Sequence, residues 1–98
     1  MAKKGYWVSA YRAIHNQEQV GKYAQLAGPA LQKFGARYIA REVAAAAYEA
    51  GIKARIVIVE FDSVQKAIAA HDSPDYQAAL KVLGQAAERD FRIVEGVD

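Results

Sequence analysis

The stretch that decides the fold is Arg55-Ile56-Val57-Ile58-Val59-Glu60-Phe61. Its four consecutive β-branched residues favour a β-strand, in which successive side chains point to opposite faces of the sheet. The two isoleucines therefore make one face of this strand apolar, and the two valines make the other face apolar. A chain of 98 residues has only enough helix to cover one face of a sheet. We expect a second copy of the protein to cover the other face.

The remaining elements follow from strand formers, capping residues and the spacing of apolar side chains. Strand-forming runs predict strands at residues 6–13, 37 to about 44, 53–61 and 91–97. Apolar residues at spacings of three and four predict helices that begin after Asn16, Ser63 and Ser73. Pro29 predicts a kink or a new start within the first helix. The alanine-rich run at 44–48 stays ambiguous, because alanine favours helix.

The predicted order is strand, helix, strand, strand, helix, strand. This order is typical of an α+β fold of the ferredoxin-like β-α-β-β-α-β type, an antiparallel sheet with helices on one face. We predict one domain over residues 1–98, with a mobile tail at residues 1–4. Since the second face of the sheet is also apolar, we predict a homodimer in which two sheets form a dimeric α/β barrel.

Composition and charge exclude several classes of protein. Hydrophobic residues form 53% and charged residues 24% of the chain, and the net charge of +2 comes from scattered Lys and Arg. We therefore expect no nucleic-acid partner. The absence of cysteine excludes disulfides, thiolate catalysis and cysteine metal ligands, and it fits a cytoplasmic protein. No apolar run predicts a signal peptide or a membrane span.

Five short segments carry a resemblance to a known family. They are Gly5-Tyr6-Trp7, Phe34-Gly35-Ala36-Arg37-Tyr38, Glu60-Phe61 with Ser63, Ser73-Pro74-Asp75-Tyr76-Gln77 and Val94-Glu95-Gly96. On these segments the chain resembles domain-of-unknown-function family 1330. The resemblance implies the dimeric α/β-barrel superfamily, which includes small monooxygenases, dehydratases and muconolactone-isomerase-like proteins. The family itself has no established activity, so the resemblance implies a fold and an assembly but no reaction.

The chain departs from the pattern of the family after its second predicted strand. The family usually has a pair of glycines after the arginine and a tryptophan later in the hairpin. Here Arg41 is followed by Glu42-Val43 and four alanines, with Tyr48 further on. Glycine permits close backbone approach and positive φ, which glutamate and valine discourage. We expect the hairpin to be reshaped.

The candidate ligand site lies on two neighbouring strands of the predicted sheet. In a regular strand Arg37 and Arg41 point to the same face. Glu60 shares its face of the next strand with the two isoleucines, so a barrel interior between sheet and partner would hold two cations and a carboxylate. Arginine binds carboxylates and phosphates through paired hydrogen bonds, which favours a small polar or anionic organic ligand. Alternatively, an arginine pairs with Glu60 or Glu42 and only stabilises the sheet or the dimer.

Aromatic side chains complete the candidate ligand-binding set, which includes Tyr38 and Tyr76. Tyr76 either lines the pocket or packs its ring and ties helix to strand through its hydroxyl. Ser73 is expected to be a helix cap rather than a nucleophile. The large aromatics of the sheet either line a pocket or form plain core and interface, and they are Tyr6, Trp7, Tyr11 and Tyr38.

Two titratable side chains, His71 and Glu60, are weak candidates for acid–base catalysis. An imidazole can exchange a proton near neutral pH. Alternatively, His71 interacts with the last carbonyls of its helix. His15 and His71 are far apart in sequence and share no predicted face, so we expect no metal site, and no motif indicates a cofactor.

Two hypotheses about function remain open from the sequence. The first is a small, cofactor-free enzyme or ligand-binding protein that uses the barrel interior. The second is a non-catalytic dimerisation or interaction module whose polar residues serve only packing. A fold of this type hosts both kinds of protein, so the residues of a site have to decide between them.

Overall fold

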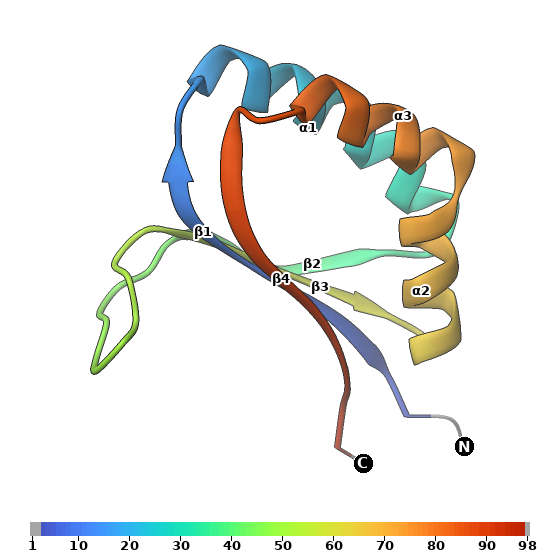
Figure 1. Cartoon of the computed structure of the whole chain (residues 1–98). Helices are drawn as coiled ribbons and strands as arrows, with labels where there is room; N and C mark the ends of the chain where they lie inside the picture. The colour runs from blue at the N-terminus through green and yellow to red at the C-terminus, as the bar shows by residue number, and fades with distance from the viewer. Residues whose placement is uncertain (1–2, 98) are drawn as a thin grey trace.

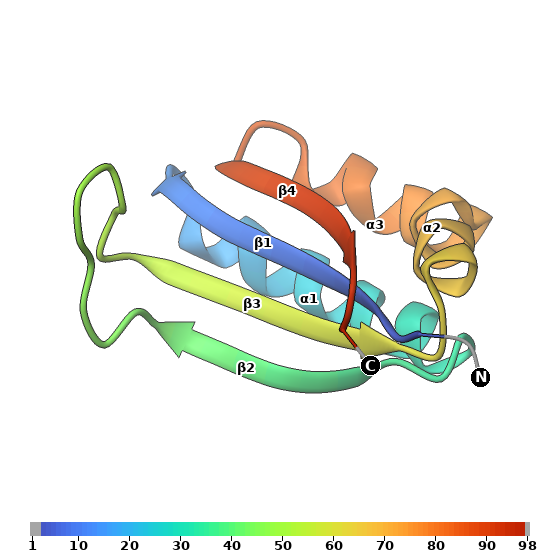
Figure 2. The ribbon, with the colours of Figure 1, turned by 90° about the horizontal axis from the view of Figure 1, so that it is seen from below.

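The computed structural model describes residues 3–97, which form four strands and three helices (Figure 1). Their order is β1 (Gly5–Ile14), α1 (Gln17–Gln32), β2 (Arg37–Val43), β3 (Arg55–Phe61), α2 (Val64–Asp72), α3 (Pro74–Leu83) and β4 (Ala87–Glu95). The strands make one antiparallel sheet in the order β2-β3-β1-β4. All three helices lie on the same face of the sheet (Figures 1 and 2). The predicted ferredoxin-like α+β fold is confirmed.

Several predicted boundaries differ from those of the structure. The alanine-rich segment between β2 and β3 is a loop rather than helix or strand, and β3 begins at Arg55. β4 begins at Ala87, a residue that the helical spacing placed on the inner side of α3. Of the predicted mobile tail, residues 1–2 lie outside the described residues. The Lys4 carbonyl accepts a hydrogen bond from the Gly96 N–H at 2.8 Å.

The helices begin where the sequence places their caps. The side-chain oxygens of Asn16, Ser63 and Ser73 each accept a hydrogen bond from a backbone N–H three residues further on. Such caps satisfy N–H groups that have no partner within the helix. Pro29 lies inside α1, which continues through it as a single helix, so the expected new start does not occur.

The hydrophobic core lies between the sheet and the helices. Trp7 of β1 is at its centre, with its ring centroid 5.2 Å from that of Phe61, 4.9 Å from that of Tyr76 and 5.0 Å from that of Phe91. Its indole N–H donates to the Ala67 carbonyl of α2 at 2.9 Å. A buried tryptophan needs a hydrogen-bond acceptor for its indole N–H. This bond provides one and also fixes the orientation of the ring. Sheet and helices are thereby held together around one aromatic cluster.

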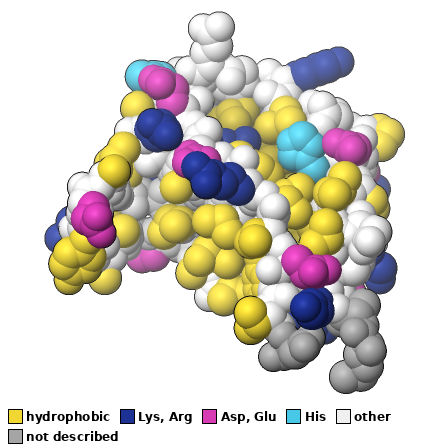
Figure 3. All heavy atoms as spheres, turned by 60° about the horizontal axis from the view of Figure 1, so that its bottom comes forward, with side chains coloured by type: hydrophobic (Ala, Val, Ile, Leu, Met, Phe, Trp, Pro, Cys, Tyr) yellow, Lys and Arg dark blue, Asp and Glu magenta, His cyan; other side chains and the backbone are white. Residues whose placement is uncertain are grey.

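The face of the sheet that lies away from the helices, here called the open face, is also rich in apolar side chains (Figure 3). Strand pairing places Val8 of β1 opposite Ile58 of β3, and both are only half-buried. Val94 of β4, which pairs with Tyr6 on this face, is 52% exposed. The prediction that β3 is apolar on both faces is therefore confirmed, whereas its pairing with a second copy stays a prediction.

None of the helices within residues 3–97 combines the length and the apolar character that crossing a membrane requires.

Candidate ligand cavity

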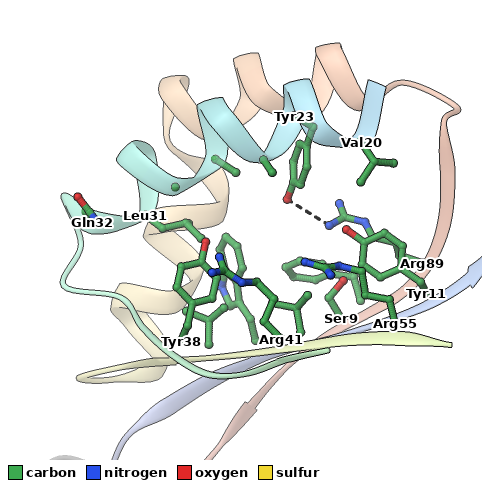
Figure 4. A pocket seen from close by; sticks show the side chains of 17 residues that line it. Ser9, Tyr11, Val20, Tyr23, Leu31, Gln32, Tyr38, Arg41, Arg55 and Arg89 are labelled. Carbon is green, nitrogen blue, oxygen red and sulfur yellow. Dashed lines mark hydrogen bonds between the residues drawn. The ribbon is translucent and has the colours of Figure 1, made fainter. Parts of the chain in front are cut away.

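A cavity of about 330 Å³ lies between α1 and the helix-covered face of the sheet (Figure 4). Its floor is formed by side chains of all four strands, and its roof by α1. The roof residues Ala24, Ala27 and Gly28 have small or no side chains, so α1 does not fill the space above the sheet. Sites that bind small organic molecules have volumes from about 300 Å³ upward, so the space suffices for one small ligand.

Aromatic rings form much of the cavity wall. Trp7 and Tyr11 of β1 and Phe91 of β4 contribute from the sheet, and Tyr23 contributes from α1. Tyr38 of β2 lines the cavity too, and is partly exposed. Flat, apolar walls of this kind favour a planar or apolar ligand skeleton.

Three arginines also line the cavity: Arg41 of β2, Arg55 of β3 and Arg89 of β4 (Figure 4). No lining side chain within residues 3–97 is a carboxylate, and none of these three arginines makes an ion pair with a described residue. Two of them, Arg41 and Arg89, contact aromatic rings instead. The guanidinium carbon of Arg41 lies 4.4 Å from the Tyr38 ring centroid, and that of Arg89 lies 5.1 Å from the centroid of Tyr23. The cavity is therefore strongly cationic.

Arg89 is held by a small hydrogen-bond network. Its Nη1 donates to the Tyr23 hydroxyl oxygen at 3.2 Å, and this oxygen lies 2.6 Å from the hydroxyl oxygen of the fully buried Tyr76. Burial raises the pKa of Tyr23 well above its usual range, so its hydroxyl stays protonated at neutral pH. Burial lowers the pKa of Arg89, but the two tyrosine oxygens raise it by more, and the guanidinium stays charged. The network thus presents a fixed cation to the cavity.

Ser9 adds an unpartnered hydroxyl to the cavity floor. Its side chain is 4% exposed, and its Oγ has no hydrogen-bond partner among the described residues. An unpaired buried hydroxyl costs about 1–3 kcal/mol, so such groups are rare and require an explanation. A polar atom of a ligand in the cavity would satisfy it.

The structure separates the residues that the sequence placed together. The pairing of β2 with β3 shifts by one residue between Tyr38 and Ala40, so β2 is not a regular strand. Arg37 pairs across from Glu60 on the open face, whereas Arg41 pairs across from Val57 and lines the cavity. The expectation that Arg37 and Arg41 share a face is wrong, because a bulge reverses the alternation of side chains.

On the open face Arg37 and Glu60 form part of a polar cluster. Arg37 Nε lies 2.8 Å from Glu60 Oε1 and its Nη2 lies 3.0 Å from Asp62 Oδ1, while the Tyr6 hydroxyl donates to Glu60 at 2.7 Å. The Arg37 guanidinium, followed by the Tyr6 hydroxyl, lowers the pKa of Glu60. Every charged group of the cluster has a partner, which fits the alternative reading of Arg37 as a stabiliser of the sheet.

The two candidate acid–base groups lie on opposite sides of the sheet. His71 lies at the end of α2, where its ring packs against those of Trp7, Tyr76 and Phe91 at centroid distances of 6.2, 5.4 and 5.5 Å. Its Nδ1 is 3.1 Å from Asp72 Oδ1, and its ring is not part of the cavity wall. Glu60 lies on the open face, so these two side chains cannot act on one ligand.

Of the tyrosines in the candidate set, Tyr38 lines the cavity and Tyr76 lies behind Tyr23. Ser73 caps α3 through its Oγ. His15 lies 2.8 Å from Glu88. Within residues 3–97, no three side chains of the metal-binding types His, Cys, Asp or Glu come close enough together to hold an ion.

The sequence did not point to Ser9, Tyr23, Arg55 or Arg89. A usable signal was present, because Arg55 alternates in phase with Val57 and Val59, and Arg89 alternates in phase with Phe91. A cation in phase with the buried face of a strand indicates a polar site within the core. The last strand as predicted from the sequence begins at residue 91 and so does not include Arg89.

A model of the family described as domain of unknown function (DUF1330) matches residues 4–97. The chain belongs to this family. The resemblance read from the five sequence segments is confirmed, and it spans nearly the whole chain. No curated protein sequence matches the chain.

Several solved structures share this fold at low sequence identity. A protein of unknown function from Rhodopseudomonas palustris has a TM-score of 0.75 at 16% identity, with 100% of this chain and 85% of that one covered. SnoaB, a cofactor-independent oxygenase from Streptomyces nogalater, has a TM-score of 0.67 at 8% identity, with 99% and 96% covered. A dimeric ferredoxin-like protein of unknown function from Thermobifida fusca has a TM-score of 0.59 at 17% identity, with 98% and 93% covered. Identities this low establish a shared fold alone.

Proposed function

We propose that this DUF1330 protein binds a small anionic organic molecule in the cavity beneath α1. The observation that carries the proposal is the presence of Arg41, Arg55 and Arg89 in one cavity wall that contains no carboxylate. The sequence predicts such a ligand between the sheet and a partner subunit. The cationic cavity supports a site on the opposite, helix-covered face instead.

The physical argument concerns unpaired charge. Arg55 and Arg89 are half-buried, whereas Arg41 is exposed. A guanidinium that is partly removed from water is stabilised by a nearby anion, and each arginine can hold a carboxylate through two parallel hydrogen bonds. Three cations close together also repel one another, so an anion among them relieves that repulsion. In a cavity with apolar walls these attractions are stronger than in water.

Binding is better supported than acid–base catalysis. The lining side chains within the described residues include no His, Lys, Asp or Glu. Of the lining hydroxyls, that of Tyr23 has a raised pKa and is a poor proton donor or acceptor at neutral pH. A reaction in this cavity would rely on binding, orientation and charge stabilisation by the arginines. SnoaB, a cofactor-independent oxygenase, has the same fold, which supports an enzymatic role for a cavity of this kind by analogy.

We also propose that the protein is a homodimer through the open face of its sheet. The apolar side chains of this face support the proposal, because large exposed apolar patches are unusual on monomers. Val8 and Ile58 are half-buried, and Val94 is more exposed. A neighbour in fold, the Thermobifida fusca protein, is described as dimeric. The ligand cavity lies on the opposite side of the sheet, so each copy carries its own site.

Tryptophan fluorescence tests the binding proposal, since Trp7 is the only tryptophan and lines the cavity. We expect an aromatic carboxylate to change the emission of Trp7 saturably, and Arg41→Gln to weaken its binding about tenfold. A charge-assisted hydrogen bond contributes about 1.5–3 kcal/mol, and 1.4 kcal/mol corresponds to tenfold. Arg12→Gln is the matched control, because Arg12 is exposed and outside the cavity.

The competing function is that of a dimerisation module without a ligand. The polar cluster around Arg37 and Glu60 on the open face favours this second function, because its charged groups are already paired with one another. If aromatic and aliphatic carboxylates leave the Trp7 emission of the wild type unchanged at millimolar concentration, the binding proposal is wrong and this second function is favoured.

A further inference from the structure

We infer that the ligand is a flat aromatic acid with two anionic groups, such as a benzene dicarboxylate. This inference rests on the proposed function and goes beyond it by naming the class of ligand. Three observations carry it: the direction of the hydrogen bonds around Tyr23, the number of unpaired cations, and the arrangement of the rings.

The hydrogen bonds around Tyr23 run toward the cavity. The hydroxyl oxygens of Tyr23 and Tyr76 are 2.6 Å apart, and either could donate. Because Tyr76 is fully buried and its proton needs an acceptor, we assign Tyr76 as the donor. Arg89 Nη1 donates to the same oxygen. With its oxygen accepting twice, Tyr23 keeps its own proton free, and Tyr23 lines the cavity. It therefore offers a donor to the ligand.

The Ser9 hydroxyl is a second free donor, and the guanidinium groups supply further N–H donors. Five polar side chains of the cavity thus converge as donors, and they are Ser9, Tyr23, Arg41, Arg55 and Arg89 (Figure 4). Carboxylate oxygens only accept, and each carboxylate accepts several hydrogen bonds. The match between a donor-rich site and an acceptor-only group favours carboxylates over alcohols and amides.

The number of cations favours two anionic groups rather than one. A single carboxylate facing Arg41, Arg55 and Arg89 leaves an excess of two positive charges in a partly enclosed cavity. The strand order is β2-β3-β1-β4, so Arg41 and Arg55 approach from one side of β1 and Arg89 from the other. β3 and β4 flank β1, so their backbones are two strand spacings apart, about 10 Å, which leaves room between the long arginine side chains for a small ring with acid groups at two ends.

The rings favour a flat skeleton between the two acid groups. Trp7 and Tyr11 of the central strand β1 line the cavity between the two groups of arginines, together with Phe91 of β4. Rings stack on rings or meet them edge to face, and such pairs bind more strongly than an aliphatic chain of the same area. The volume of about 330 Å³ suits one ring with its substituents.

The test compares three probes by Trp7 fluorescence and calorimetry: isophthalate, benzoate and glutarate. Isophthalate has two carboxylates on a ring, benzoate has one, and glutarate has two on a flexible chain. We expect isophthalate to bind at least about tenfold more tightly than benzoate or glutarate. Arg55→Gln should remove most of the preference for isophthalate over benzoate, while the matched control Arg12→Gln keeps it.

The outcomes separate the inference from the proposed function. If benzoate binds the wild type as tightly as isophthalate, the two-anion inference is wrong, although the cavity still binds an anion. If glutarate binds as tightly as isophthalate, the aromatic part of the inference is wrong. If none of the three binds, the inference fails together with anion binding in this cavity.

Discussion

Arginines on the two faces of the sheet differ in whether they have an acidic partner. On the open face Arg37 lies between Glu60 and Asp62, and Arg92 pairs with Asp90 at 2.9 Å. On the helix-covered face Arg41 and Arg55 have no acidic partner among the described residues. Paired arginines complete a structure, whereas unpaired arginines in a cavity leave a charge for something else to neutralise. The difference distinguishes the surface that we propose for dimerisation from the cavity that we propose for ligand binding.

The largest effect is expected from placing a carboxylate on either face of β3. Val59 is 1% exposed and faces the helices, whereas its neighbour Ile58 lies on the open face. An unpaired buried charge costs several kcal/mol, which is comparable to the whole stability of a small domain. We expect Val59→Asp to unfold the protein and Ile58→Asp to leave a folded monomer. Circular dichroism and analytical ultracentrifugation measure these outcomes.

A dimer that survives Ile58→Asp would contradict the role assigned to the open face. Lys81→Gln is a suitable control for this experiment, because Lys81 is exposed on α3, away from the sheet. We expect it to remain dimeric and to unfold like the wild type.

The second effect concerns the tyrosine pair behind the cavity. Tyr23→Phe leaves the buried hydroxyl of Tyr76 without a partner, at a cost of about 1–3 kcal/mol. Tyr76→Phe removes a donor, and the Tyr23 oxygen still accepts from Arg89, so the cost is about 1 kcal/mol. We therefore expect Tyr23→Phe to lower the free energy of unfolding more, as measured by denaturant titration. Equal losses would contradict the direction given to the hydrogen bond.

The third effect is a gain in stability on one face and a loss on the other. Arg55→Leu removes an unpaired cation from among like charges, so we expect the melting temperature without ligand to rise by roughly 4 °C. Arg37→Leu removes the partner of Glu60 and Asp62, so we expect the melting temperature of this variant to fall below that of the wild type. Differential scanning calorimetry measures both. If the two variants lower the melting temperature alike, the contrast between paired and unpaired arginines is wrong.

The smallest effect is a dependence of stability on pH from the open face. Arg37, followed by Tyr6, lowers the pKa of Glu60 below its ordinary value of 4.5. A carboxyl with a lowered native pKa stabilises the fold above its unfolded pKa, and this contribution is lost as the pH falls through the native pKa. We expect the difference in unfolding free energy between the wild type and Glu60→Gln to be full near pH 7 and to shrink below about pH 4.5. A difference that stays constant down to pH 2 would contradict the pairing.

The fold could be predicted from the sequence because local signals agree with one another. β-Branched runs, caps such as Asn16 and Ser73, and apolar spacing all indicate the same order of elements. The family could be recognised for the same reason, since its segments occur at the junctions of these elements. The ends of the strands could be predicted less well, because residues such as Ala87 fit both helix and strand.

The candidate site could be predicted only in part. The sequence predicts a small polar or anionic ligand from two arginines of one strand, and of these Arg41 lines the cavity, together with Tyr38. The face did not follow, because a bulge near Ile39 depends on how β2 pairs with β3 and not on the residues of β2 alone. The cavity itself arises where small residues of α1 meet the sheet, such as Ala27 and Gly28, and this is a property of tertiary packing.

The most direct test of the central claim is a crystal structure of the protein grown with isophthalate. We expect the ring to lie beneath α1, with carboxylate oxygens within hydrogen-bond distance of Arg89 and of Arg41 or Arg55. Isophthalate bound beside Arg37 on the open face, with the cavity beneath α1 containing only water, would contradict it.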